Sequence, residues 1–168
     1  MTMLRAILVS LCLLVSLEAA STPRPLADVS VPISDGTKIS LSQFRGKVMV
    51  IALISTTCDH CATSLLLLRN LQKEYGPRGF QILAVAGNDG AAKTLGNVSG
   101  LQLGFPVGYL DQNTTMQVFD FKREDHPFVP MYIFVDKKGA VRFQYTAQDE
   151  FFKKEEKNTR LLIEALLK

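Results

Sequence analysis

Two cysteines separated by two residues stand between a wholly apolar run and a segment with helical spacing. The apolar run is Val48–Ile54, the cysteines are Cys58 and Cys61, and leucines follow at steps of three and four. A strand, a Cys-x-x-Cys motif and a helix in this order are typical of a thiol–disulfide redox site. Because the apolar run has no polar residue, we expect a strand buried on both faces, as at the centre of a parallel sheet.

The first part of the chain, residues 1–21, has the pattern of a secretory signal peptide. A basic residue precedes an apolar run over residues 6–17, and small residues then follow up to Ser21. We predict cleavage after Ser21, a linker over residues 22–30 and one domain over residues 31–168. An uncleaved membrane anchor is the alternative for the same segment. Either form predicts export, to the periplasm or cell envelope of a bacterium.

Length, charge and cysteine content narrow the class of function. The chain has 168 residues, and its formal net charge of +3 is too weak to indicate nucleic-acid binding. Cys12 lies in the signal segment, so the exported chain would keep only Cys58 and Cys61. A structural zinc site needs four ligands, and a pair so close in sequence adds little chain-entropy stability. The pair is therefore interpreted as redox chemistry that needs no cofactor or metal.

The remaining chain alternates between strand and helix patterns and closes with a hairpin, which predicts a three-layer α/β sandwich. In the final helix we expect Leu161, Leu162, Ala165 and Leu166 to face inward. The expected elements are a hairpin over 31–39, a helical turn at 41–47, helices over 61–75, 91–98, 113–119 and 150–167, and strands over 80–86, 105–110, 131–135 and 141–145.

The expected position of the cysteines assigns them different roles. If the helix begins just after Cys58, its sulfur faces free backbone N–H groups and the positive end of the helix dipole. In such motifs the thiol pKa falls from about 8.5 to between about 3.5 and 7. Cys58 would then attack a substrate disulfide, and Cys61, one turn further in, would resolve the mixed disulfide. His60 favours the thiolate by charge, and Asp59 acts in the opposite sense.

Several stretches resemble the TlpA/ResA branch of the thioredoxin superfamily, with its redoxin domain. They are residues 35–47, Phe105-Pro106-Val107 with Asp111, and the stretch from Val129-Pro130 to Gly139, which surround the cysteine motif at the expected distances. The resemblance implies a thioredoxin-like α/β/α sandwich with an N-terminal hairpin extension and a central αβ insertion. It also implies a cis Pro130 that presents the Val129 backbone to an extended substrate. Protein thiols or disulfides would be the substrates, with a soluble or membrane-associated redox donor.

The chain departs from this family's pattern at three positions. Thr57 stands where members usually have Trp, and Asp59 stands where they usually have Pro. Many members also carry an acid after the strand that corresponds to residues 80–86. The nearest matches here are Asn88 and, one place later, Asp89, which we name as a possible general acid/base.

Two other readings share the redoxin fold. In a Sco-type copper chaperone, Cys58, Cys61 and His126 would bind copper, because soft thiolates suit Cu(I). In a peroxiredoxin, Pro and Thr precede the peroxidatic cysteine, whereas Ile51 and Ser55 occupy those places here. The residues at these two places disfavour the peroxiredoxin reading. Both readings are alternatives to our main prediction, in which a Cys58–Cys61 disulfide exchanges with protein thiols.

Overall fold

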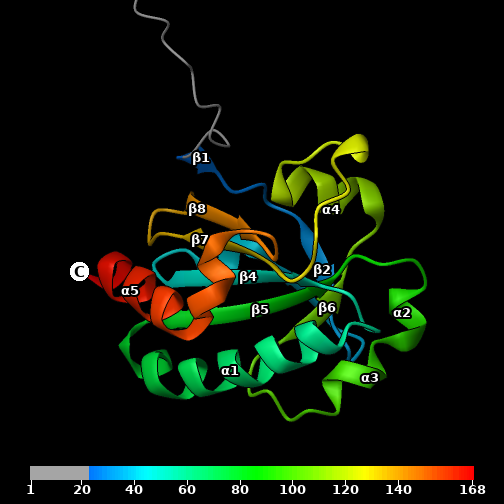
Figure 1. Ribbon diagram of the computed structural model, residues 1–168, viewed down its shortest axis with the longest axis horizontal. Helices are drawn as coiled ribbons and strands as arrows, with labels where there is room; N and C mark the ends of the chain where they lie inside the picture. Colours follow the sequence, from blue (N-terminus) through cyan, green and yellow to red (C-terminus); the bar gives the residue numbers. More distant parts are fainter. Residues whose placement is uncertain (1–22) are drawn as a thin grey trace, which may run out of the picture.

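The computed structural model describes residues 23–168, so the predicted signal peptide lies outside the described residues. A six-stranded mixed sheet forms the middle layer (Figure 1). In spatial order its strands are β1 (Arg24–Pro25), β8 (Ala140–Thr146), β7 (Met131–Val135), β4 (Val48–Ile54), β5 (Phe80–Ala86) and β6 (Val107–Tyr109). A separate hairpin joins β2 (Ser30–Pro32) to β3 (Lys38–Ser40) and meets the sheet through a bridge between Ile33 and Gly108.

Strand β4 is the centre of the sheet, and all seven of its residues are buried. Val50 and Ala52 belong to the core on one face, and Ile51 and Leu53 belong to the core on the other. The prediction of a doubly buried strand is confirmed. Its neighbours differ in direction, because β4 pairs parallel with β5 and antiparallel with β7.

Helices cover both faces of the sheet, which confirms the three-layer architecture (Figure 1). One face carries α1 (Asp59–Tyr75), α2 (Ala91–Thr94), α3 (Gly96–Ser99), the 3₁₀ turn η4 (Glu150–Lys154) and α5 (Glu155–Leu167). The opposite face carries the 3₁₀ turn η1 (Leu41–Phe44) and α4 (Gln112–Phe119). Two further 3₁₀ turns are η2 (Gly76–Arg78) and η3 (Arg123–Asp125). The helix expected over 91–98 is divided into α2 and α3.

The inward face of α5 agrees with the expected one at Leu162 and Leu166, which are half-buried and pack against the core, but differs from it at Leu161 and Ala165. Thr159 and Ile163, one turn apart, are fully buried, whereas Leu161 is 56% exposed and Ala165 is exposed as well. Two residues along a helix correspond to more than half a turn, so burial of Ile163 directs Leu161 toward solvent.

A segment of the predicted linker forms a strand of the sheet. Arg24 begins the edge strand β1, and its guanidinium donates to the carbonyl of Val118 at 2.9 Å.

Within residues 23–168, no helix is both long enough and apolar enough to cross a membrane.

Candidate redox site

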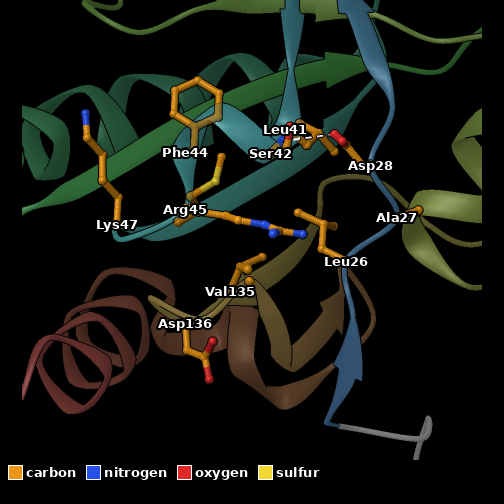
Figure 2. A pocket seen from close by; sticks show the side chains of 12 residues that line it. Leu26, Ala27, Asp28, Leu41, Ser42, Phe44, Arg45, Lys47, Val135 and Asp136 are labelled. Carbon is orange, nitrogen blue, oxygen red and sulfur yellow. Dashed lines mark hydrogen bonds between the residues drawn. The ribbon is translucent and has the colours of Figure 1, made fainter.

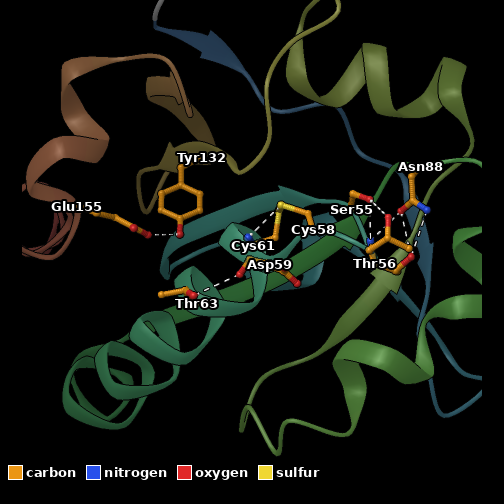
Figure 3. The surroundings of a disulfide bond; sticks show 10 residues. Ser55, Thr56, Cys58, Asp59, Cys61, Thr63, Asn88, Tyr132 and Glu155 are labelled. Atoms are coloured by element: carbon orange, nitrogen blue, oxygen red, sulfur yellow. Dashed lines mark hydrogen bonds between the residues drawn. A yellow bond between two sulfur atoms is a disulfide. The ribbon is translucent and has the colours of Figure 1, made fainter.

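Cys58 and Cys61 form a disulfide where β4 gives way to α1 (Figure 3). Cys58 is the N-cap of α1, with extended backbone angles, and its sulfur accepts a hydrogen bond from the Cys61 N–H at 3.1 Å. The two Cα atoms are 5.2 Å apart. Cys58 is half-buried, whereas Cys61 is fully buried in the core beneath the helix. Only the first cysteine of the pair is therefore accessible to a substrate.

The residues around Cys58 in sequence form the exposed rim of the site. Thr57, Asp59 and His60 are all exposed, and Asp59 and His60 occupy the first turn of α1. The carbonyl of Asp59 accepts a hydrogen bond from the Thr63 hydroxyl at 3.2 Å. Because both side chains are exposed, Asp59 and His60 act on Cys58 through solvent, which limits the strength of their effect.

Asn88 holds the loop that carries the cysteines. Its side-chain oxygen accepts a hydrogen bond from the buried Thr56 N–H at 3.0 Å (Figure 3). The hydroxyls of Thr56 and Thr94 are 2.6 Å apart. In turn, the Ser55 carbonyl accepts from the Cys58 N–H at 3.3 Å. The sequence pointed to Asn88 only as a substitute for an acid, but it joins the end of β5 to the approach to Cys58.

Asp89, named as a possible general acid/base, is exposed in the turn after β5. Its carboxylate takes part in no hydrogen bond or ion pair among the residues that the structure describes. A base that acts on a thiol must come within hydrogen-bonding reach of it. The structure shows no contact between the Asp89 carboxylate and either cysteine, so its role stays a prediction.

The segment before β7 lies beside the cysteines, as expected. The Val129–Pro130 peptide bond is cis, and Pro130 is buried. Val129 is half-buried and packs against the same core as Cys58. Because Met131 pairs with Leu53 in the antiparallel register, Val129 comes opposite the loop that follows β4.

A partly buried polar pair, which the sequence analysis missed, lies on the Cys61 side of the sheet. The Tyr132 hydroxyl donates to the Glu155 carboxylate at 2.6 Å (Figure 3). Burial, followed by the negative charge of Glu155, raises the pKa of Tyr132 well above its usual value. Tyr132 and Cys61 belong to one core cluster. The sequence signal was a single hydroxyl in the otherwise apolar strand β7.

A cleft of about 290 Å³ opens at the carboxyl ends of β4 and β5, where Ser55 belongs to the loop that leads to Cys58. Val129, Phe121, Arg123 and His126 also line it. Sequence analysis did not predict this cleft, because its walls come from segments far apart in the chain. A second hollow, between β1, η1 and the β7–β8 turn, has only about 30 Å³, the space of one water molecule (Figure 2).

The copper alternative required Cys58, Cys61 and His126 to converge. Within the described part of the chain, no three His, Cys, Asp or Glu side chains gather as potential metal ligands. His126 instead lies in the cleft wall, with a left-handed backbone at φ 41°. The structure therefore gives the copper reading no ligand set.

Curated relatives match only part of this chain. A chloroplastic phospholipid hydroperoxide glutathione peroxidase of Arabidopsis thaliana is 32% identical over 65 residues, which cover 39% of this chain and 28% of that protein. A Solanum lycopersicum protein named for the same activity is 28% identical over 82 residues, 49% of this chain and 48% of that protein. The chain thus spans less than half the length of these relatives.

Solved structures match over most of the chain. A thiol:disulfide interchange protein of the thioredoxin family from Chlorobium tepidum has a TM-score of 0.72 at 18% identity, covering 89% of this chain and all of that one. An exposed lipoprotein thioredoxin from Streptococcus pneumoniae has a TM-score of 0.62 at 20% identity, covering 80% of this chain and 99% of that one. These likenesses establish the thioredoxin-like fold. Residues 23–144 match the AhpC/TSA family, and because they make up most of the chain and include both cysteines and Pro130, the chain belongs to that family.

Proposed function

We propose that this protein is an extracytoplasmic thiol–disulfide oxidoreductase that exchanges its Cys58–Cys61 disulfide with protein thiols and disulfides. The observation that carries the proposal is the difference in burial within the pair. Cys58 is half-buried at a helix N-cap, whereas Cys61 is fully buried one turn further in. That arrangement suits one attacking and one resolving sulfur.

On the protein's side, the reaction needs only these two sulfurs. In the reductive direction it has two steps. The Cys58 thiolate attacks one sulfur of a substrate disulfide, forms a mixed disulfide and releases the first substrate thiolate. The Cys61 thiolate then attacks Cys58, re-forms the internal disulfide and releases the second substrate thiolate. A soluble or membrane-associated dithiol donor returns the pair to the reduced form. We propose that no metal or cofactor takes part.

The proposed location outside the cytoplasm is supported by sequence rather than by geometry. Residues 1–21 have the signal-peptide pattern, and the Streptococcus pneumoniae relative is described as an exposed lipoprotein. Expression of the full chain in a bacterial host, followed by fractionation and N-terminal sequencing, tests this. We expect a periplasmic form that begins at Thr22. A form that stays in the cytoplasm with Met1 intact would contradict the proposal.

The activity itself is tested by reduction of a protein disulfide such as that of insulin, with dithiothreitol as electron donor. Acceleration over the donor alone is expected for the native protein, and Cys58→Ser should abolish it. Cys61→Ser should remove catalytic turnover, because the mixed disulfide could no longer be resolved internally. An acceleration that persists in Cys58→Ser would contradict the proposal.

A thiol peroxidase is the second candidate, because curated relatives are named as phospholipid hydroperoxide glutathione peroxidases. Peroxide would then oxidise the Cys58 thiolate to a sulfenic acid, and Cys61 would condense with it to release water. Stopped-flow consumption of hydrogen peroxide by the reduced protein separates the two candidates. We expect peroxide to react much more slowly than a protein disulfide, and the opposite order would favour the peroxidase.

A further inference from the structure

We propose that the cleft lined by Ser55, Arg123 and Val129 receives an acidic side chain of the substrate, located close in sequence to the substrate's reacting cysteine. This inference rests on the proposed function and concerns the choice of substrate. The cleft would make Arg123 a specificity-determining residue, which favours disulfides with Glu or Asp nearby.

The cleft is continuous with the segments that surround Cys58. Ser55 and Val129 both line the cleft. The carbonyl of Ser55 accepts a hydrogen bond from the Cys58 N–H, and Val129 packs against the same core as Cys58. Gly87 and Asn88, the first residues of the loop after β5, also line the cleft. A substrate cysteine bonded to Cys58 would therefore bring its neighbouring residues to the mouth of this cleft.

Arg123 brings a positive charge to the wall of the cleft. Arg123 and His126 contribute to its wall, and the twelve lining residues, all within the described chain, include no carboxylate. The guanidinium of Arg123 donates to neutral amide oxygens, at 2.7 Å to Gln112 and 3.3 Å to Asn113. These contacts orient the cation without neutralising it.

The acidic residues of the same loop do not line the cleft. Asp120 forms an ion pair with Arg24 at 3.5 Å, and the Asp125 carboxylate accepts the Lys122 N–H at 2.6 Å. Glu124 is exposed and does not line the cleft. A carboxylate supplied by another molecule would thus complement the charge of the cleft, and a guanidinium binds carboxylates with well-directed hydrogen bonds.

Size and shape favour a side chain over a separate small ligand. The volume of about 290 Å³ lies at the lower limit for small-molecule sites, which usually measure about 300–1,000 Å³. An extended peptide directs successive side chains to opposite sides. If such a peptide runs along Val129, one of its side chains would enter the cleft between the apolar walls at Phe121 and Pro127.

The test uses synthetic peptides that each carry one disulfide-bonded cysteine. Glu is placed at each of the three positions on either side of that cysteine, and Gln or Lys at the same position serves for comparison. We expect the native protein to show a kcat/KM about three- to tenfold higher for Glu than for Gln at one position at least, with Lys the poorest. This range corresponds to the net gain of about one ordinary hydrogen bond, because solvent in the open cleft weakens the interaction of the charges.

Variants then locate the source of the preference. Arg123→Gln should bring the Glu-to-Gln ratio to about one, whereas Lys122→Gln, an equal change of charge at the neighbouring residue outside the cleft, should preserve it. A ratio near one for the native protein at every position, a preference for Lys, or a Glu preference that survives Arg123→Gln would overturn the inference. Peptide turnover that survives Cys58→Ser would instead overturn the proposed function.

Discussion

The backbone N–H of Cys61 donates a hydrogen bond to the Cys58 sulfur across 3.1 Å, within the first turn of α1. This N–H is one of the donors that a helix start leaves without a partner in the helix. After reduction the same donor can stabilise a Cys58 thiolate, together with the helix dipole. One backbone group thereby links the fold of the loop to the reactivity of the sulfur.

The exposed charges beside Cys58 should tune the reduction potential modestly. A cationic His60 stabilises the thiolate and makes the disulfide more oxidising, so His60→Gln should lower the potential. Asp59→Asn should raise it. Interactions of about 0.5–2 kcal/mol correspond to changes on the order of 10–40 mV. Equilibration with glutathione buffers at pH 6 measures both variants, and shifts of the opposite sign would contradict this reading.

Asn88, rather than Asp89, should matter for the loop that carries the cysteines. Asn88→Ala leaves the buried Thr56 N–H without its partner, which should cost about 1–3 kcal/mol of unfolding free energy. The variant should also slow disulfide exchange, because the approach to Cys58 loses its anchor. Asp89→Ala is the matched control and should change the unfolding free energy by less than about 0.5 kcal/mol. Urea unfolding and insulin reduction measure the pair, and a greater loss of activity in Asp89→Ala would instead support the predicted role of Asp89 as an acid/base.

Tyr132 should make the protein lose stability in alkali. Its pKa is raised by burial, so above about pH 10 the unfolded chain releases the phenol proton while the folded protein keeps it. The unfolding free energy therefore falls as the pH rises, by up to about 1.4 kcal/mol per pH unit for this group. Tyr132→Phe should be less stable by about 1 kcal/mol at pH 7, but should lose less between pH 9 and 11. A slope identical to that of the native protein would exclude this contribution.

The N-terminal hairpin should contribute directly to the stability of the sheet edge. A Cβ at Gly108 would lie 2.5 Å from the Pro32 carbonyl oxygen and 2.5 Å from a methyl carbon of Val31. Gly108→Ala should therefore cost about 1–3 kcal/mol through forced displacement. Gly96→Ala provides the control, because a Cβ there meets nothing within 4 Å. Equal melting temperatures for the two variants would show that the hairpin can move away from residue 108 without loss of stability.

The sequence predicted the elements well where one physical signal was strong. The wholly apolar β4, the leucine spacing of α1 and the closing hairpin of β7 and β8 are local patterns, and the structure has the expected element at each of them. The sequence failed where the periodicity was ambiguous. In α5, leucines on adjacent faces allowed two helical phases, and only packing against the sheet selected the one that buries Ile163.

The site was predictable only in the part that is contiguous in sequence. The cysteine pair and Pro130 carry recognisable motifs, and the structure brings both to the same end of the sheet. The Tyr132–Glu155 pair and the cleft at Arg123 depend on segments far apart in the chain, which no local pattern encodes. Asn88 was noticed for the wrong reason, because its hydrogen bond to Thr56 depends on the parallel pairing of β4 with β5.

The assignment of Cys58 as the attacking sulfur and Cys61 as the resolving sulfur is tested most directly by trapping the mixed disulfide. Reduced Cys61→Ser and reduced Cys58→Ser are each mixed with a peptide disulfide, and intact mass spectrometry follows the adduct. Cys61→Ser should gain one peptide per protein within minutes, because the half-buried Cys58 sulfur attacks the peptide disulfide and no internal thiol then displaces the peptide. Cys58→Ser should gain almost none, because Cys61 is fully buried. Equal adducts on the two variants, or an adduct on Cys58→Ser alone, would contradict the assignment of Cys58 as the attacking sulfur.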